Sequence, residues 1–272
     1  MPALGGQKAF GGAVLMGIVN VTPDSFSDGG QFDTVQSALD HARRLVTEGA
    51  AIIDLGGEST RPGHAPVTVE EEQARVLPVL KALTGDPALA GAVVSIDTFK
   101  AATARAAVAA GARIINDIWG LQRDANMAHV VADSHVPVVV MHNSDVLEPE
   151  RDIVDILRTF FDESLRLARQ AGVPEQHIIL DPGIGFGKTP EQGMQALRRL
   201  HEIKALGFPV LVGASRKSFI GKLTGGRAPQ ERLPGTLAAH LLATARGADI
   251  LRVHDVQAHA DALRVFEAIS RA

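Results

Sequence analysis

Eight short apolar runs recur along the chain, and a loop or helical segment follows each of them. The predicted strands are residues 14–19, 51–55, 92–96, 113–115, 136–140, 178–180, 208–212 and 248–251. Strands that alternate with helices indicate a parallel sheet with right-handed crossovers. Eight such units in about 250 residues predict an α/β fold of the (β/α)8 TIM barrel type, with its active site at the carboxyl ends of the strands. An open doubly wound sheet is the alternative, but it requires a glycine-rich phosphate fingerprint after the first strand, and the sequence has none there.

Helical periodicity and capping signals fill the intervals between these runs. Predicted helices begin near Thr34 and after Thr68 and Thr189, and others cover about 99–110, 150–171, 229–246 and 257–269. No linker or low-complexity stretch interrupts the pattern, so we predict that residues 1–272 form a single domain.

Composition narrows the class of protein. The chain is 46% hydrophobic but only 4% aromatic, which suits a core of Val, Ile, Leu and Ala between strands and helices. A net charge of -4 gives no electrostatic reason to expect a nucleic-acid partner. The absence of cysteine excludes disulfides, thiolate metal sites and cysteine nucleophiles. The start of the chain lacks a secretory pattern, and no apolar run approaches the roughly 20 residues that span a bilayer. We therefore expect a cytoplasmic protein with no membrane partner.

Polar and charged residues lie at or just past nearly every predicted strand end. They are Asn20, Asp97, Asn116, Asp117, Asp181, Ser215, Lys217, Arg252 and His254. Asp and Asn also favour turns and caps, so any one of them has a structural explanation. Lysine and arginine are not typical turn residues, however, and in a barrel all these positions converge on one mouth.

One of these strand ends continues into the glycine-rich stretch Asp181–Lys188. An apolar run stops at Asp181, three glycines and a proline then turn the backbone, and Thr189 with Gln192 resembles a capping box that opens a helix. We expect this turn to present the Asp181 carboxylate to a pocket.

The types of residue in this ring indicate the ligand. Carboxylates and carboxamides suit the edge of a flat, nitrogen-rich heterocycle, and Asp181 facing an amino-amidine edge can make paired, charge-assisted hydrogen bonds. Lys217 can donate to a ring carbonyl, and Arg252 can stack on the ring face. Arg61, Arg252 and His254 supply positive charge for a phosphorylated arm. Asn20 offers a neutral oxygen to Mg²⁺ that already carries phosphate oxygens and water.

The loops at these strand ends resemble the signatures of the dihydropteroate synthase family. The matching stretches are 16–30, 56–63, 95–98, 115–117, 181–188, 215–218 and 252–255, in the order of that family and across essentially the whole chain. The resemblance implies a (β/α)8 barrel that joins 6-hydroxymethyl-7,8-dihydropterin diphosphate to p-aminobenzoate in folate biosynthesis. It also implies a homodimer.

The resemblance assigns the candidate residues to subsites. The pterin would be held by Asp97, Asn116, Asp181 and Lys217, lined by Met141 and Phe186, and stacked on by Arg252. The diphosphate would be bound by Asn20, Arg61, Arg252 and His254, with Mg²⁺ at Asn20. The p-aminobenzoate site, where sulfonamides compete, would be formed by Phe26, Thr60, Arg61, Pro62 and Ser215. The residues expected to act in catalysis are Asp97, Lys217, Arg252 and His254.

The mechanism that the resemblance implies is substitution at the pterin methylene. The arylamine is neutral near pH 7 and needs little help to lose its proton, so departure of the diphosphate is the demanding step. Mg²⁺ and cationic side chains would stabilise the leaving charge, and Asp97 would steady positive charge on the pterin.

Two other functions remain as alternatives. A related barrel methyltransferase, which passes a methyl group from methyltetrahydrofolate to a corrinoid protein, shares the pterin-holding Asp and Asn but does not need the diphosphate cations. A catalytically silent paralogue would keep the barrel and bind pterin without turnover.

Three further residues have structural interpretations. Asp54 lies in the middle of a strand, so we expect a buried hydrogen-bonded role. Arg216 is expected in an ion pair, and His142 is as consistent with packing as with ligand contact.

Overall fold

All eight strands lie in one parallel sheet that closes on itself. The computed structural model describes residues 12–21, 31–58 and 67–272. The strands are β1 Val14–Asn20, β2 Ile52–Gly56, β3 Val93–Asp97, β4 Ile114–Asp117, β5 Val138–Met141, β6 Ile178–Asp181, β7 Leu211–Val212 and β8 Ile250–Val253. They are hydrogen-bonded in the order β6-β5-β4-β3-β2-β1-β8-β7. A parallel bridge between Leu180 and Val210 then joins β6 to β7. The sheet is therefore the (β/α)8 barrel predicted from the alternation of the sequence.

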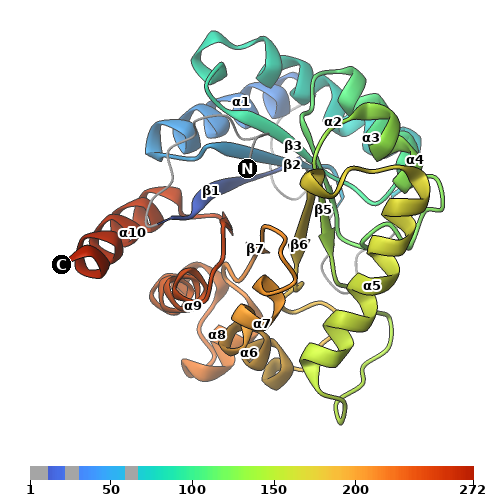
Figure 1. Cartoon of the computed structure of the whole chain (residues 1–272). Helices are drawn as coiled ribbons and strands as arrows, with labels where there is room; N and C mark the ends of the chain where they lie inside the picture. Colours follow the sequence, from blue (N-terminus) through green and yellow to red (C-terminus); the bar gives the residue numbers. More distant parts are fainter. Residues whose placement is uncertain (1–11, 22–30, 59–66) are drawn as a thin grey trace.

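Helices surround this barrel (Figure 1). They are α1 Gln31–Glu48, α2 Val69–Gly85, α3 Ala101–Ala109, α4 Met127–Ser134, α5 Ile153–Ala171, α6 Pro190–Arg198, α7 Leu200–Lys204, α8 Ser218–Leu223, α9 Leu233–Ala245 and α10 Val256–Arg271. Short 3₁₀ turns occupy Pro87–Leu89, Glu175–His177 and Pro229–Glu231. Within the described residues, no helix combines the length and the apolar character needed to cross a membrane.

The helix ends follow local signals in the sequence. Thr189 and Gln192 form the expected capping box of α6, in which each backbone N–H donates to the other side chain at 3.1 Å. One predicted helix differs from the structure. The predicted helix 229–246 is split, because a 3₁₀ turn precedes α9 and Pro234 lies in the first turn of that helix. No helix was predicted at α4 or α8, whose eight and six residues are too few for a clear periodic pattern.

The period-two alternation of the strands builds two layers inside the barrel. Successive side chains on a strand point to opposite faces of the sheet. The lower layer is a small apolar cluster of Val14, Met16, Ala51, Ile52, Ile114, Val139, Ile179, Leu211 and Ile250. Two residues further along the same strands come Asp54, Asn116, Asp181 and Arg252. These polar side chains share the inward face and lie one layer nearer to the carboxyl ends, so strand geometry alone gathers them at the mouth.

The outward-facing side chains form the larger core between the sheet and the helices. Leu15, Val19, Ile53 and Leu55 on the first two strands belong to it, together with buried residues of the surrounding helices. Because packing in this core fixes which face of each strand points outward, it also fixes which side chains point into the barrel and reach the mouth.

Glycine is required in the turn that follows β6. Gly183 has a φ of +63°, and a Cβ atom added there would lie 2.0 Å from the carbonyl oxygen of His142. The turn after β6 therefore packs directly against the backbone at the end of β5, with no room for any side chain at this position.

We expect Gly183→Ala to lower the free energy of unfolding, measured by urea denaturation, by about 1–3 kcal/mol through overpacking in addition to backbone strain. Gly172→Ala is the matched control, because Gly172 also has a positive φ (+84°) but no neighbouring atom within 4 Å of an added Cβ. Equal losses in the two variants would contradict the packing interpretation.

Candidate active site

Arg252 connects two buried carboxylates at the mouth of the barrel. Its Nε donates to Asp54 Oδ2 at 2.6 Å, and its Nη2 donates to Asp97 Oδ2 at 2.8 Å. These residues come from β8, β2 and β3, so the guanidinium joins strands on either side of β1. Because both acids are buried or nearly so, the cation between them is what makes their ionised forms tolerable.

Asp54 also binds the amide of Asn116. Asn116 Nδ2 donates to Asp54 Oδ2 at 3.0 Å, which fixes the orientation of the carboxamide. Asp54 has no exposed surface, as expected for a buried hydrogen-bonded residue, and its Oδ1 has no hydrogen-bond partner in the structure. The predicted buried, hydrogen-bonded role of Asp54 is thus confirmed. Its partners are two candidate pterin-binding side chains, Asn116 and Arg252, which Asp54 therefore orients.

Burial controls the protonation of the two candidate pterin-binding acids. It raises the pKa of Asp97 to about 7, although Arg252 opposes the shift and Asp54 adds to it. Burial likewise raises the pKa of Asp181 to about 6, against the Gly183 N–H and the cations Lys217, Lys188 and Arg252. The folded protein therefore binds protons at Asp97 and Asp181 more tightly than the unfolded chain does. The contribution of these two carboxyl groups to the free energy of unfolding is present at low pH and is lost as pH rises through their folded-state pKa values.

The turn after β6 brings Asp181, Phe186 and Lys217 together. Gly183 N donates to Asp181 Oδ1 at 2.7 Å, so one carboxylate oxygen is held by the turn itself. Lys217 Nζ lies 4.0 Å from the centre of the Phe186 ring, within the range of a cation–π contact. Met141 is buried and lies beside Asp181 in the register of β5 and β6. These four candidate pterin residues therefore lie on one side of the mouth.

Ser215 and His254 form a second pair, where the chain leaves β7 and β8. Ser215 Oγ lies 2.8 Å from His254 Nδ1, and the backbone N–H of His254 donates to the same Oγ at 3.2 Å. Arg216 turns away and makes a two-point ion pair with Asp255, at 2.6 and 3.0 Å. The predicted structural role of Arg216 is thus confirmed.

One predicted member of the ring lies on the other face of the sheet. Asp117 follows Asn116 directly, so strand alternation points its side chain outward. Its two carboxylate oxygens accept from the backbone N–H groups of Trp119 and Leu121, at 2.9 and 2.7 Å. The expectation that Asp117 converges on the mouth is therefore wrong, and its role is to close a turn.

Gly56 lies between the side chains of Asn20, the predicted Mg²⁺ ligand, and Asp97. A Cβ atom at Gly56 would lie 3.3 Å from Asn20 Oδ1 and 3.6 Å from Asp97 Oδ2. Among the described residues there is no cluster of three or more acidic, histidine or cysteine side chains that could enclose a metal ion. Mg²⁺ at Asn20 therefore stays a prediction from the sequence.

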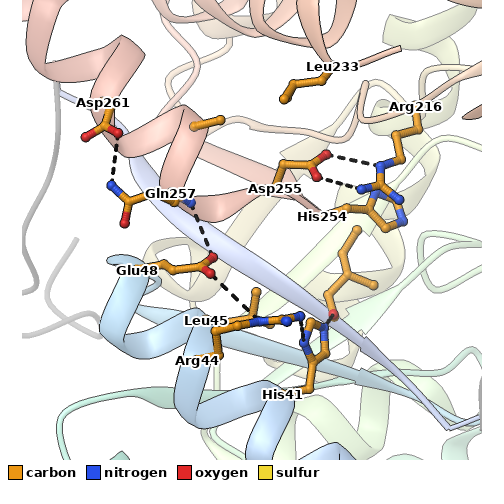
Figure 2. Close-up of a pocket in the computed structure, with 12 residues that line it drawn as sticks. His41, Arg44, Leu45, Glu48, Arg216, Leu233, His254, Asp255, Gln257 and Asp261 are labelled. Atoms are coloured by element: carbon orange, nitrogen blue, oxygen red, sulfur yellow. Dashed lines mark hydrogen bonds and ion pairs between the residues drawn. The ribbon is translucent and has the colours of Figure 1, made fainter. Parts of the chain in front are cut away.

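A cavity of about 660 Å³ lies beside the mouth, between α1 and α10 (Figure 2). His41, Arg44 and Glu48 of α1 face Gln257 and Asp261 of α10 across it, and His254 and Arg216 line one end. Asp97, Asn116, Asp181 and Lys217 do not line it. We therefore place the ring-binding site at the carboxyl ends of the strands, and this cavity outside it.

Four candidate residues lie outside the described residues: Phe26, Thr60, Arg61 and Pro62. Their assignment to the p-aminobenzoate or diphosphate subsites remains a prediction.

Two residues near the site, Asp54 and Lys188, were not among the predicted site residues. The position of Asp54 two residues after the inward-facing Ile52 is the sequence signal that could have placed it in the site.

Comparison with known proteins gives the class of protein first. A family model described as pterin binding enzyme matches residues 16–254, so the chain is a pterin-binding enzyme. It is 47% identical to the dihydropteroate synthase of Bacillus subtilis over 94% of this chain and 88% of that protein. Two structures of the Xanthomonas albilineans dihydropteroate synthase are similar, each covering 96% of this chain and 94% of the other. One, with 4-aminobenzoic acid, has 48% identity and a TM-score of 0.90. The other, with 7,8-dihydropteroate, has 46% identity and a TM-score of 0.87. The chain belongs to the dihydropteroate synthase family.

We expect Arg252→Met to lower the free energy of unfolding by about 3–5 kcal/mol at pH 8, because Asp54 and Asp97 then remain buried without their cation. Near pH 5 the loss should be smaller, since Asp97 is protonated there and no longer needs a partner. Urea denaturation at both pH values measures the difference.

Arg166→Met is the control, because it removes an exposed ion pair with Glu163 and should cost less than about 1 kcal/mol at either pH. A loss for Arg252→Met that is small, or that does not change with pH, would contradict the proposed coupling.

Proposed function

We propose that this protein condenses 6-hydroxymethyl-7,8-dihydropterin diphosphate with p-aminobenzoate, giving 7,8-dihydropteroate and diphosphate. The observation that carries the proposal is the Arg252 cluster. In a chain nearly half identical to dihydropteroate synthases, it joins an arginine, two acids and an amide at the mouth of the barrel. This combination suits a planar heterocycle with several donors and acceptors along its edge.

The pterin ring would lie between the turn after β6 and Arg252. The Asp181 carboxylate would accept from the amino-amidine edge, and Asn116, oriented by Asp54, would hydrogen-bond to the adjacent ring edge. Lys217 would donate to the ring carbonyl, with Phe186 and Met141 against the ring as apolar lining. Arg252 is held by Asp54 and Asp97, so its planar guanidinium is already fixed for stacking on the ring face.

The diphosphate would lie toward β1 and β8, near Asn20, Arg252 and His254, with Arg61 as a further contact. Asn20 Oδ1, and the space that Gly56 leaves beside it, fit Mg²⁺ carried in with the diphosphate. When bound, Mg²⁺ would supply positive charge that stabilises the departing diphosphate.

The reaction is a substitution at the pterin methylene carbon. The bond from that carbon to the diphosphate oxygen breaks, and its electron pair leaves with the diphosphate. The amine nitrogen of p-aminobenzoate forms the new bond and then loses a proton. Positive charge that develops on the pterin faces the carboxylate of Asp97, while Arg252 and His254 face the leaving group. Catalysis then rests on positioned charges and on orientation of the two substrates.

The p-aminobenzoate subsite would lie near Ser215, with Phe26, Thr60, Arg61 and Pro62 completing it. Sulfonamides, which resemble p-aminobenzoate, would compete there. We also propose a homodimer, and its action in the cytoplasm stays a prediction from the sequence.

No specific observation favours the corrinoid methyltransferase or the catalytically silent paralogue. The similar proteins are dihydropteroate synthases, which argues against a corrinoid methyltransferase. Measuring turnover distinguishes an active synthase from a silent paralogue.

We expect the purified protein, given the pterin diphosphate, p-aminobenzoate and Mg²⁺, to form dihydropteroate with one diphosphate released per product. A coupled diphosphate assay and chromatography of the product measure the two yields. Pterin binding by calorimetry without product from the folded protein would indicate the silent paralogue.

We expect the affinity for 6-hydroxymethylpterin to fall as pH drops below about 6, because the protonated Asp181 carboxyl cannot accept from two donors. Asp181→Asn should weaken binding by about 1–3 kcal/mol at pH 8. The difference in pterin affinity between Asp181→Asn and the unaltered protein should become smaller toward pH 5, where Asp181 is protonated. Calorimetry over this range measures both effects, with the exposed Asp162→Asn as control. An unchanged affinity in Asp181→Asn would exclude the assignment.

A further inference from the structure

Lys188 is a buried cation behind the proposed pterin site. It is only 8% exposed, although it ends the glycine turn that follows β6. Its Nζ donates to His142 Nδ1 and, at 3.0 Å, to the carbonyl oxygen of Phe186. Both of these partners are uncharged groups, although burying a cation without a carboxylate beside it costs folding free energy. Such an arrangement points to a role beyond stability.

The partners of Lys188 show which parts of the site it joins. His142 directly follows β5, it is 2% exposed, and its backbone N–H donates to Asp181 O at 2.9 Å. Phe186 is the residue whose ring contacts the Lys217 amine. Lys188 therefore ties the end of β5 to the turn that positions Phe186 and Lys217. A hydrogen bond to His142 Nδ1 requires a neutral imidazole with its proton on Nε2, and burial together with Lys188 lowers the pKa of His142 to about 3.

The charge of Lys188 acts on Asp181. Three cations, Lys217, Lys188 and Arg252, each lower the pKa of the Asp181 carboxyl against the larger effect of burial. Burial lowers the pKa of Lys188 to about 7, while Asp181 raises it and Lys217 lowers it further. Lys217 and Arg252 would themselves contact the pterin, whereas Lys188 lies behind the turn, bound to His142 and to the Phe186 carbonyl.

We propose that Lys188, held by His142, is a positioning residue for pterin recognition, which fixes the turn that carries Phe186 beside Asp181. This inference rests on the proposed function. It assigns no contact between Lys188 and substrate, so its loss should change pterin binding and leave p-aminobenzoate recognition nearly intact.

The test uses Lys188→Met, which keeps an unbranched apolar stem of similar shape and removes the ammonium group. We expect 6-hydroxymethylpterin to bind roughly tenfold more weakly at pH 7, because the Phe186 turn loses its anchor and Asp181 loses a nearby cation. The pH below which affinity falls should move upward, because Asp181 loses one of its cations. In steady-state assays the KM for the pterin diphosphate should rise, while the KM for p-aminobenzoate stays within about twofold. A purely structural role would not move the pH dependence.

Two further variants keep the proposal falsifiable. Lys188→Arg retains the charge and should restore part of the pterin affinity, and Lys81→Met, at an exposed position on α2, should match the unaltered protein. If Lys188→Met does not fold, Lys188→Gln replaces it, because it keeps an N–H donor without charge. Failure of both to fold would assign Lys188 to folding and overturn the proposal. Unchanged pterin affinity and pH dependence would overturn it as well.

The calorimetric measurement separates this proposal from the proposed function. Weaker pterin binding in Lys188→Met supports the role of Lys188 whether or not the protein turns over. If the unaltered protein does not bind pterin at all, the proposed function and this inference both fail.

Discussion

The ion pairs of Arg252 with Asp54 and Asp97 are the interaction on which the site depends. A guanidinium in a barrel interior is costly to bury, and so are two carboxylates, unless each meets an opposite charge with good geometry. Here one planar cation meets both acids, and Asp54 also fixes Asn116. The apolar layer beneath leaves these groups little water. The cluster is therefore rigid before any ligand arrives, which is what recognition of a flat ring requires.

The same burial that makes the cluster costly prepares it for its ligand. Burial raises the pKa values of Asp97 and Asp181 and lowers the pKa of Lys188, so all three groups change their protonation state near pH 7. A ligand that donates to the carboxylates offsets the cost of ionising them. Burial at the mouth therefore costs folding free energy, while a small apolar cluster fills the lower layer of the barrel.

Much of the fold followed from the sequence, because strand and helix periods repeat eight times with polar residues at strand ends. The candidate residues Asp97, Asn116, Asp181 and Arg252 were found in this way, and strand alternation explains why they meet. Asp117 was wrongly predicted to face the mouth, because an aspartate after a strand can equally well accept hydrogen bonds within a turn. The partners of Asp54 and the role of Lys188 were not predicted, because they depend on contacts with residues far along the chain, Arg252 and His142, which no local pattern encodes.

A crystal structure with a pterin analogue and p-aminobenzoate tests the central claim most directly. The account predicts that the pterin edge hydrogen-bonds to Asp181 and Asn116, and that Arg252 lies against the ring face while still paired with Asp54. A pterin bound in the cavity between α1 and α10, or an Arg252 that has left Asp54 and Asp97 to reach the ring, would contradict it.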